Sequence, residues 1–261
     1  NVVDVWSAPF PIAYGKEDLE AGAHAISSLE AATAALKKGE VDVLVTAPIH
    51  KKSIQSDTFK FPGHTDYLNE QLEGDSLMFM VTDSLKVALM SDHIPLKEVV
   101  GYLNEEKINA KIASLEKSLS QDFGIQRPKI AVLGINPHTG DNGVIGDEDD
   151  TLLTPVIKKW NEKGSLVFGP YAADGFFGNQ RYTKFDGVLA TYHDQGLIPF
   201  KTLSFGQGVN FTAGLSHVRT SPDHGTAFDI AGKGVADASS FSEAVYTARA
   251  IFLHRKEVNF S

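Results

Sequence analysis

The chain has 261 residues, of which 42% are hydrophobic and 22% are charged, and its formal net charge is −9. This composition is typical of a globular protein with one large core or two smaller ones. The acidic balance argues against nucleic acid as a partner, because binding to a phosphate backbone needs a basic surface. The chain has no cysteine, which excludes disulfides, thiolate metal ligands and cysteine nucleophiles.

No apolar run approaches the roughly 20 residues that a membrane-spanning helix needs. No signal peptide is visible at the start either. We therefore expect a cytoplasmic protein with no membrane partner. The chain begins with Asn1 rather than Met, and we interpret this as a sign that an amino-terminal portion is absent.

Taken in chain order, the hydrophobic pattern predicts helices that alternate with strands. The expected helices cover residues 19–36, 99–119, 152–163 and 240–253, and the expected strands cover residues 41–46, 76–81, 85–90, 129–135 and 187–191. The second and third strands are separated only by Thr82-Asp83-Ser84, which predicts an antiparallel hairpin. Between the last predicted strand, which ends at Thr191, and Gly234, glycines are frequent and no helix or strand is predicted. The alternation indicates an α/β fold with a mixed, largely parallel sheet.

Three histidines, His93, His138 and His193, each follow a predicted strand. Ligands of α/β sheets gather where strands end and loops begin. Neutral imidazole suits zinc and other divalent ions, and three protein ligands leave a position open for substrate or water. The adjacent Asp92 and Asp194 are candidates to orient these ligands. For any one histidine alone, a hydrogen-bonded loop residue remains the alternative.

A second set of side chains is basic or polar and suits a small phosphorylated substrate. Lysine supplies a point charge, arginine supplies a fork that matches phosphate oxygens, and polar side chains on a glycine loop add donors. The set comprises His64, Thr65, Lys201, Asn210 and Arg219. For Lys201 and Arg219 taken singly, surface exposure is the alternative.

The segment from Asp223 to Gly234 combines a histidine, an acid and several glycines. No Gly-x-Gly-x-x-Gly motif follows a strand, so an ordinary dinucleotide fingerprint is missing. This loop is the alternative nucleotide site, with His224 against adenine and Asp229 on the ribose hydroxyls. A carboxylate there favours NAD over NADP. A glycine-rich helix start without a ligand remains the other interpretation.

Together, the motifs resemble the 4-hydroxythreonine-4-phosphate dehydrogenase family of the pyridoxal phosphate pathway, from about Val41 to Ala236. In order, they are Thr46-Ala47-Pro48-Ile49-His50-Lys51, Gly63-His64-Thr65, Asp92-His93-Ile94-Pro95-Leu96, Asn136-Pro137-His138, Tyr192-His193-Asp194-Gln195-Gly196 and Asp223-His224-Gly225-Thr226-Ala227. The family's Pro-Ala-Gly-Ile-Gly-Pro stretch is not found. The resemblance implies a two-lobed α/β/α sandwich like that of isocitrate and isopropylmalate dehydrogenases. Residues 1–48 and 220–261 would form the cofactor lobe, and residues 49–219 the metal and dimer lobe.

The resemblance also implies roles for the candidate residues in a homodimer whose two subunits share each active site. It assigns the metal, as Zn, Mg or Co, to His93, His138 and His193, and the substrate to His64, Thr65, Lys201, Asn210 and Arg219. It assigns NAD, with NADP as the alternative, to His224, Gly225, Ala227 and Asp229. It assigns catalytic roles to Asp174, Asp194 and Lys201.

The activity implied is an NAD- and metal-dependent oxidation and decarboxylation. The substrate would be 4-phosphooxy-L-threonine and the product 3-amino-2-oxopropyl phosphate. One alternative is a dehydrogenase of a related four-carbon acid, 4-phospho-threonate or 4-phospho-erythronate, which would keep the same histidines and phosphate contacts. The other is a phosphate-binding module without catalysis.

Overall fold

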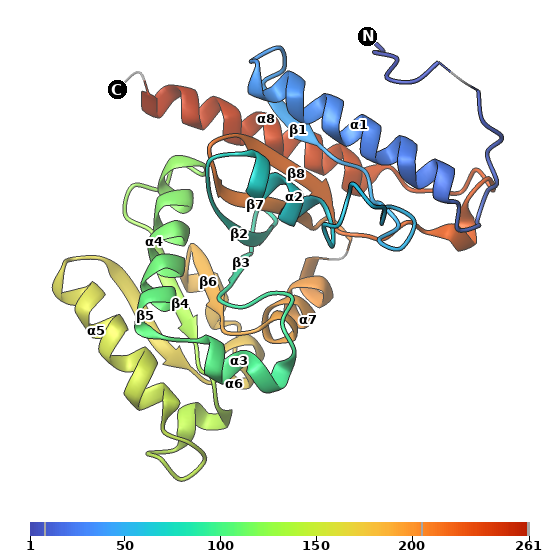
Figure 1. Ribbon diagram of the computed structural model, residues 1–261. Coiled ribbons are helices and arrows are strands. Elements are labelled where there is room, and N and C mark those ends of the chain that lie inside the picture. Colours follow the sequence, from blue (N-terminus) through green and yellow to red (C-terminus); the bar gives the residue numbers. More distant parts are fainter. Residues whose placement is uncertain (8, 205, 260–261) are drawn as a thin grey trace.

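The computed structural model describes residues 1–7, 9–204 and 206–259. Within them, eight strands form one sheet in the order β1-β8-β7-β2-β3-β6-β4-β5, with helices on both sides (Figure 1). The strands are β1 (Val43–Val45), β2 (Gly74–Val81), β3 (Lys86–Leu89), β4 (Lys129–Leu133), β5 (Leu166–Tyr171), β6 (Gly187–Ala190), β7 (Val209–Leu215) and β8 (Val218–Pro222). The helices are α1 (Leu19–Lys37), α2 (His64–Gln71), α3 (Val99–Tyr102), α4 (Glu105–Gln121), α5 (Thr154–Glu162), α6 (Ala173–Gly178), α7 (His193–Ser204) and α8 (Ser239–Asn259).

The sheet is mixed. β1 runs parallel to β8, and β3, β6, β4 and β5 run parallel to one another. Between these two groups, β7 and β2 make antiparallel pairs with the strands on either side. The predicted α/β class is therefore confirmed, as is the hairpin of β2 and β3, in which Phe79 pairs with Ala88.

Alternating side chains along the strands divide the core into layers. Val43 and Val45 pack with the cluster formed by α4, α5 and α8 on one face of the sheet. Leu44, between them, packs with α1 and α2 on the other face. On that second face, α6 and α7 cover the far strands through Phe176 and Phe200. Helices on both faces of one sheet give the expected α/β/α sandwich.

The expected helix over residues 99–119 is wrong in one respect, because the helix is interrupted between α3 and α4. Leu103 and Asn104 both have extended backbone. The Asn104 side chain accepts the N–H of Lys107 at 2.9 Å, which caps the start of α4. A polar capping residue thus divides the predicted helix into two.

The stretch without assigned elements contains α7, β7 and β8. In β7 the buried residues are interspersed with Asn210 and Gly214, so the hydrophobic alternation is interrupted. The missed strand β5 contains Gly169-Pro170, residues that usually interrupt strands.

The sheet runs continuously through the predicted lobe boundaries, since β8 contains the boundary between residues 219 and 220. The division into two lobes stays a prediction. Among the residues that the structure describes, no helix combines the length and apolar character needed to cross a membrane.

Candidate functional site

Two of the three predicted metal ligands lie together, just beyond the carboxyl ends of the interior strands β3 and β6. β3 and β6 are parallel neighbours, so their ends bring His93 and His193 to the same place, with ring centroids 5.7 Å apart. His193 is the first residue of α7 rather than part of a loop. Its Nδ1 lies 2.7 Å from Asp194 Oδ1, which leaves Nε2 as the nitrogen free to bind a ligand. Asp92 accepts the backbone N–H of His93 at 2.8 Å, so it holds the main chain there.

His138 lies in the short turn Pro137–Gly140, after β4. It is exposed and has a φ of 53°, in the left-handed region that few residues other than glycine adopt. Across residues 1–7, 9–204 and 206–259, no three His, Cys, Asp or Glu side chains are close enough to hold a metal ion. His138 therefore does not complete a three-ligand set within one chain.

A buried acid that the sequence analysis missed anchors the His138 turn. The side chain of Asp149, which is fully buried, accepts the backbone N–H of Ile135 at 2.8 Å and that of Asn136 at 2.9 Å. Glu148 accepts a 2.7 Å hydrogen bond from the Asn136 amide, and this bond lowers the pKa of Glu148. The only sequence signal was the acidic run 147–150, which resembles a solvated loop.

Gln195 makes a second connection that the sequence analysis missed. Its amide nitrogen donates to Gly134 O at 2.6 Å, and its oxygen accepts the N–H of Thr191 at 2.8 Å. These bonds join the first turn of α7 to the ends of β4 and β6. They fix the start of α7, where His193 lies.

Arg219 is buried, with 3% of its surface exposed. Surface exposure, the alternative considered from sequence, is wrong for this residue. Its guanidinium donates to two neutral hydroxyl groups, Thr46 Oγ1 and Thr212 Oγ1. Among the described residues, no carboxylate lies within ion-pair distance of it. Burial lowers the pKa of Arg219 to about 10, which still leaves the guanidinium charged at neutral pH.

His64 begins α2 and lies within electrostatic range of Arg219. Burial, and secondarily the Arg219 charge, lower the pKa of His64 to about 3. The imidazole is therefore neutral at physiological pH, with one nitrogen to donate and one to accept. Next to it, Thr65 lines a cavity of about 470 Å³ together with His93. This cavity thus brings Thr65, from the predicted substrate set, beside His93, from the predicted metal set.

Lys201 lies on α7 and is half exposed. Its Nζ is 2.9 Å from Asp223 Oδ1, at the start of the loop predicted to hold the nucleotide. The sequence analysis did not predict this ion pair. Asn210 lies on β7, two residues before Thr212 and on the same face of the strand.

The predicted nucleotide loop does not begin an α-helix, because it contains a 3₁₀ turn at Phe228–Ile230 and α8 starts only at Ser239. His224 is exposed, and its Nδ1 lies 2.9 Å from Gly225 O. Ala227 has a φ of 49°. A Cβ added at Gly225 would meet no atom within 4 Å. The loop therefore presents open space beside an exposed imidazole. Asp229 is exposed in the 3₁₀ turn of this loop. Outside the loop, the predicted catalytic residue Asp174 is exposed in the first turn of α6.

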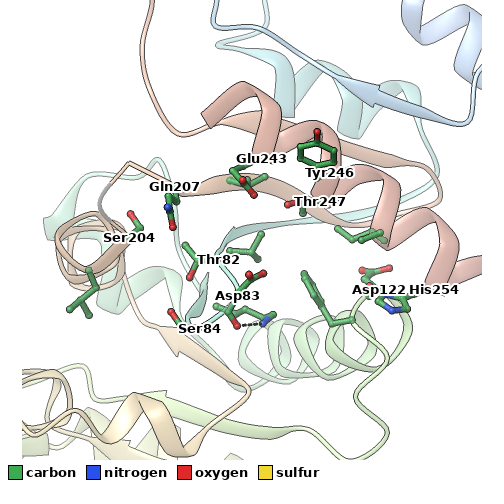
Figure 2. Close-up of a pocket in the computed structure, with 17 residues that line it drawn as sticks. Thr82, Asp83, Ser84, Asp122, Ser204, Gln207, Glu243, Tyr246, Thr247 and His254 are labelled. Atoms are coloured by element: carbon green, nitrogen blue, oxygen red, sulfur yellow. Dashed lines mark hydrogen bonds between the residues drawn. The ribbon is translucent and has the colours of Figure 1, made fainter. Parts of the chain in front are cut away.

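A cavity of about 870 Å³ lies elsewhere, between the β2–β3 turn, the ends of α4 and α7, and α8 (Figure 2). Thr82 and Ser84 of the turn and Glu243 and His254 of α8 line it. None of the predicted site residues does. The β2–β3 turn is at the opposite end of β3 from His93, so this cavity is separate from the histidine site.

The chain is similar to known proteins along most of its length. It is 48% identical over 258 residues to a 4-hydroxythreonine-4-phosphate dehydrogenase of Bacteroides thetaiotaomicron, covering 98% of this chain and 71% of that protein. A crystal structure of the enzyme of that name from Klebsiella pneumoniae matches with a TM-score of 0.79 and 38% identity, over 91% of this chain and 73% of that one.

A more distant match is a terephthalate 1,2-cis-dihydrodiol dehydrogenase of Burkholderia xenovorans. The TM-score is 0.66 and the identity 26%, over 96% of this chain and 79% of that one. The family model described as pyridoxal phosphate biosynthetic protein PdxA matches residues 1–248. This match covers α1 through the first part of α8, and with it the paired histidines and buried Arg219, so the chain belongs to the PdxA family.

Proposed function

We propose that the protein is a 4-hydroxythreonine-4-phosphate dehydrogenase, which oxidises and decarboxylates 4-phosphooxy-L-threonine to 3-amino-2-oxopropyl phosphate for pyridoxal phosphate biosynthesis. The names of its relatives support the activity. The observation in this chain that carries the proposal is Arg219, a buried cation whose hydrogen-bond partners are neutral. We expect the protein to act in the cytoplasm.

A phosphate group suits Arg219 for a physical reason. A buried charge without an opposite charge is costly, and a bound anion removes that cost. Arginine offers parallel donors whose spacing matches two oxygens of a phosphate. His64, held neutral beside it, adds a hydrogen bond without adding charge. Thr65, Lys201 and Asn210 complete the proposed substrate set.

His93 and His193 supply two imidazole donors, which suit a divalent transition metal such as Zn or Co better than Mg, an ion that prefers oxygen ligands. The third donor proposed is His138 from a second copy of the chain, which would make a homodimer with shared sites. The exposed position of His138 allows such a contact. When bound, the ion supplies Lewis acidity at the substrate hydroxyl.

In the proposed reaction, NAD held by the loop of His224 would supply the hydride acceptor for oxidation at the carbon that bears the secondary hydroxyl. The hydroxyl proton passes to a carboxylate, for which Asp194 and Asp174 are the candidates. Asp194 is bonded to His193 and thus beside the proposed metal position. The proposed NAD site consists of His224, Gly225, Ala227 and Asp229. The Asp229 carboxylate is proposed to bind the ribose hydroxyls, where it would repel the 2′-phosphate of NADP and so favour NAD.

The test is the appearance of NADH absorbance when the purified protein is given 4-phosphooxy-L-threonine, NAD and a divalent ion. Parallel reactions contain NADP, a chelator, 4-phospho-threonate or 4-phospho-erythronate. The proposal expects turnover with 4-phosphooxy-L-threonine that stops in chelator. Faster turnover of either sugar acid would replace the substrate assignment, and binding of all three without turnover would make the protein a binding module.

A further inference from the structure

Three neighbouring strands bring one arginine and two threonines to the same face of the sheet. Arg219 on β8 is level with Leu44 of β1. Thr46 directly follows β1, and its N–H donates to Thr220 O at 3.0 Å, which continues the strand pairing. On the other side, Phe211 of β7 pairs with Thr220, so Thr212 is the residue opposite Arg219. The strand register thus places one hydroxyl on each side of the guanidinium.

The two hydroxyls use three of the five guanidinium N–H groups. Nε and Nη2 of Arg219 donate to Thr46 Oγ1 at 3.2 and 2.6 Å, and Nη1 donates to Thr212 Oγ1 at 3.0 Å. Because Nη1 and Nη2 carry two hydrogens each, one N–H remains on each terminal nitrogen. Paired N–H groups of arginine bind a phosphate through two of its oxygens, so the two remaining N–H groups are available for such a ligand.

The neutrality of these partners matters as much as their position. A carboxylate in place of Thr46 or Thr212 would orient the guanidinium equally well, but it would neutralise the charge. A hydroxyl accepts a hydrogen bond and carries no net charge, so it fixes the plane of the group while leaving the full positive charge for a ligand. The threonine hydroxyls are themselves buried, with 6% and 1% of Thr46 and Thr212 exposed. Little room is left for another orientation.

We infer that Thr46 and Thr212 are positioning residues, which hold the Arg219 guanidinium so that its two remaining N–H groups bind the phosphate of the substrate. This inference rests on the proposed function. It assigns a role to the first residue of the Thr46-Ala47-Pro48 motif. A purely structural role for the threonines would stabilise the sheet equally whether or not phosphate is bound.

The experiment compares Thr46→Val and Thr212→Val with the wild type in the full-length protein. Valine keeps the shape of threonine but removes the acceptor. We expect each variant to weaken the binding of inorganic phosphate, measured by calorimetry, by about 10- to 100-fold, because a small misplacement of a clamping group has an effect of this size. KM for 4-phosphooxy-L-threonine should rise by a similar factor with a smaller change in kcat, since the phosphate contact persists through the reaction.

Thr220→Val is the matched control. Thr220 is fully buried on the same strand as Arg219, and its hydroxyl donates to Ala244 O at 2.7 Å on the α8 side of the sheet. This variant also loses a buried hydroxyl, but its phosphate affinity should equal that of the wild type. Thr46→Ser keeps the acceptor and should restore phosphate affinity to within a few-fold of the wild-type value.

Equal loss of phosphate affinity in Thr46→Val and Thr220→Val would overturn the inference, as would a fall in kcat with unchanged KM. If Thr46→Val does not fold, the pair Thr212→Val and Thr212→Ser makes the same comparison. The calorimetric titration also separates the two proposals. Suppose that the wild type binds phosphate, that Thr46→Val and Thr212→Val weaken this binding, and that the wild type does not oxidise 4-phosphooxy-L-threonine. That result would contradict the proposed function alone.

Discussion

Lys201 Nζ lies 2.9 Å from Asp223 Oδ1, and this ion pair connects helix α7 to the loop proposed to hold NAD. His193 begins the same helix two turns earlier. The pair therefore joins the proposed metal, substrate and cofactor regions through one element. Because Lys201 is half exposed, its ion pair should contribute little to stability.

This difference between stability and function gives a first prediction. Lys201→Met should change the free energy of unfolding by less than about 1 kcal/mol, as is usual for exposed ion pairs. It should lower kcat/KM for 4-phosphooxy-L-threonine by roughly 100-fold or more, since the removed charge faces a charged substrate. Lys158→Met is the control, because Lys158 forms an ion pair with Glu162 on the exposed surface of α5 and has no proposed role in the reaction. Equal kinetics for the two variants would remove Lys201 from the site.

A second prediction concerns the backbone of His138. A residue with a side chain in the left-handed region is strained by roughly 1–2 kcal/mol, and glycine relieves that strain at some entropic cost. We expect His138→Gly to keep or raise the melting temperature while it abolishes turnover. Gln180→Gly is the control, because Gln180 has a φ of 52° and no proposed role in the reaction. It should have a similar effect on melting and leave turnover intact.

A third prediction concerns the orientation of His193. Its Nδ1 is bonded to Asp194, and outer-shell carboxylates of this kind are worth about 10- to 100-fold in metal affinity. Asp194→Asn should weaken the binding of a divalent ion by such a factor, measured by titration with a competing chelator. The exposed Asp150 provides the control variant Asp150→Asn. Unchanged metal affinity in Asp194→Asn would show that this carboxylate does not orient a metal ligand.

The sequence predicted the parts of the site that depend on strand ends. Parallel strands have their carboxyl ends on one side of a sheet, so His93, His138 and His193 are predicted to meet without knowledge of the strand order, and the structure brings His93 and His193 together. The buried state of Arg219 was not predictable in this way. It depends on the order β1-β8-β7, which places β1, a strand distant in sequence, beside β8.

The interactions that were missed share a physical cause. Asp149 is fully buried within an acidic run, and the partners of its carboxylate are backbone groups, which carry no sequence signal. The Lys201–Asp223 pair likewise spans elements whose packing was not predicted. The break at Asn104 was different, because it depends on a local side-chain cap, which a prediction from hydrophobic spacing alone does not include.

The last prediction follows from the partly buried imidazole of His64. Its pKa in the folded protein is about 3, below the 6.5 of an unperturbed histidine, so below pH 6.5 the unfolded chain takes up a proton that the folded chain does not. This histidine therefore lowers the free energy of unfolding as the pH falls from 6.5 towards 3. Above pH 6.5 it has no such effect.

At pH 5 the loss amounts to roughly 2 kcal/mol relative to pH 7, from about 1.4 kcal/mol per pH unit. His64→Gln, which cannot take up the proton, should lose stability less steeply over this range. Urea unfolding at pH 5, 6 and 7 measures the difference, and His224→Gln, which replaces an exposed imidazole, is the control. Identical pH dependence in His64→Gln and the wild type would mean that His64 is protonated as easily in the folded protein as in the unfolded chain, and that it does not face Arg219 as a neutral group.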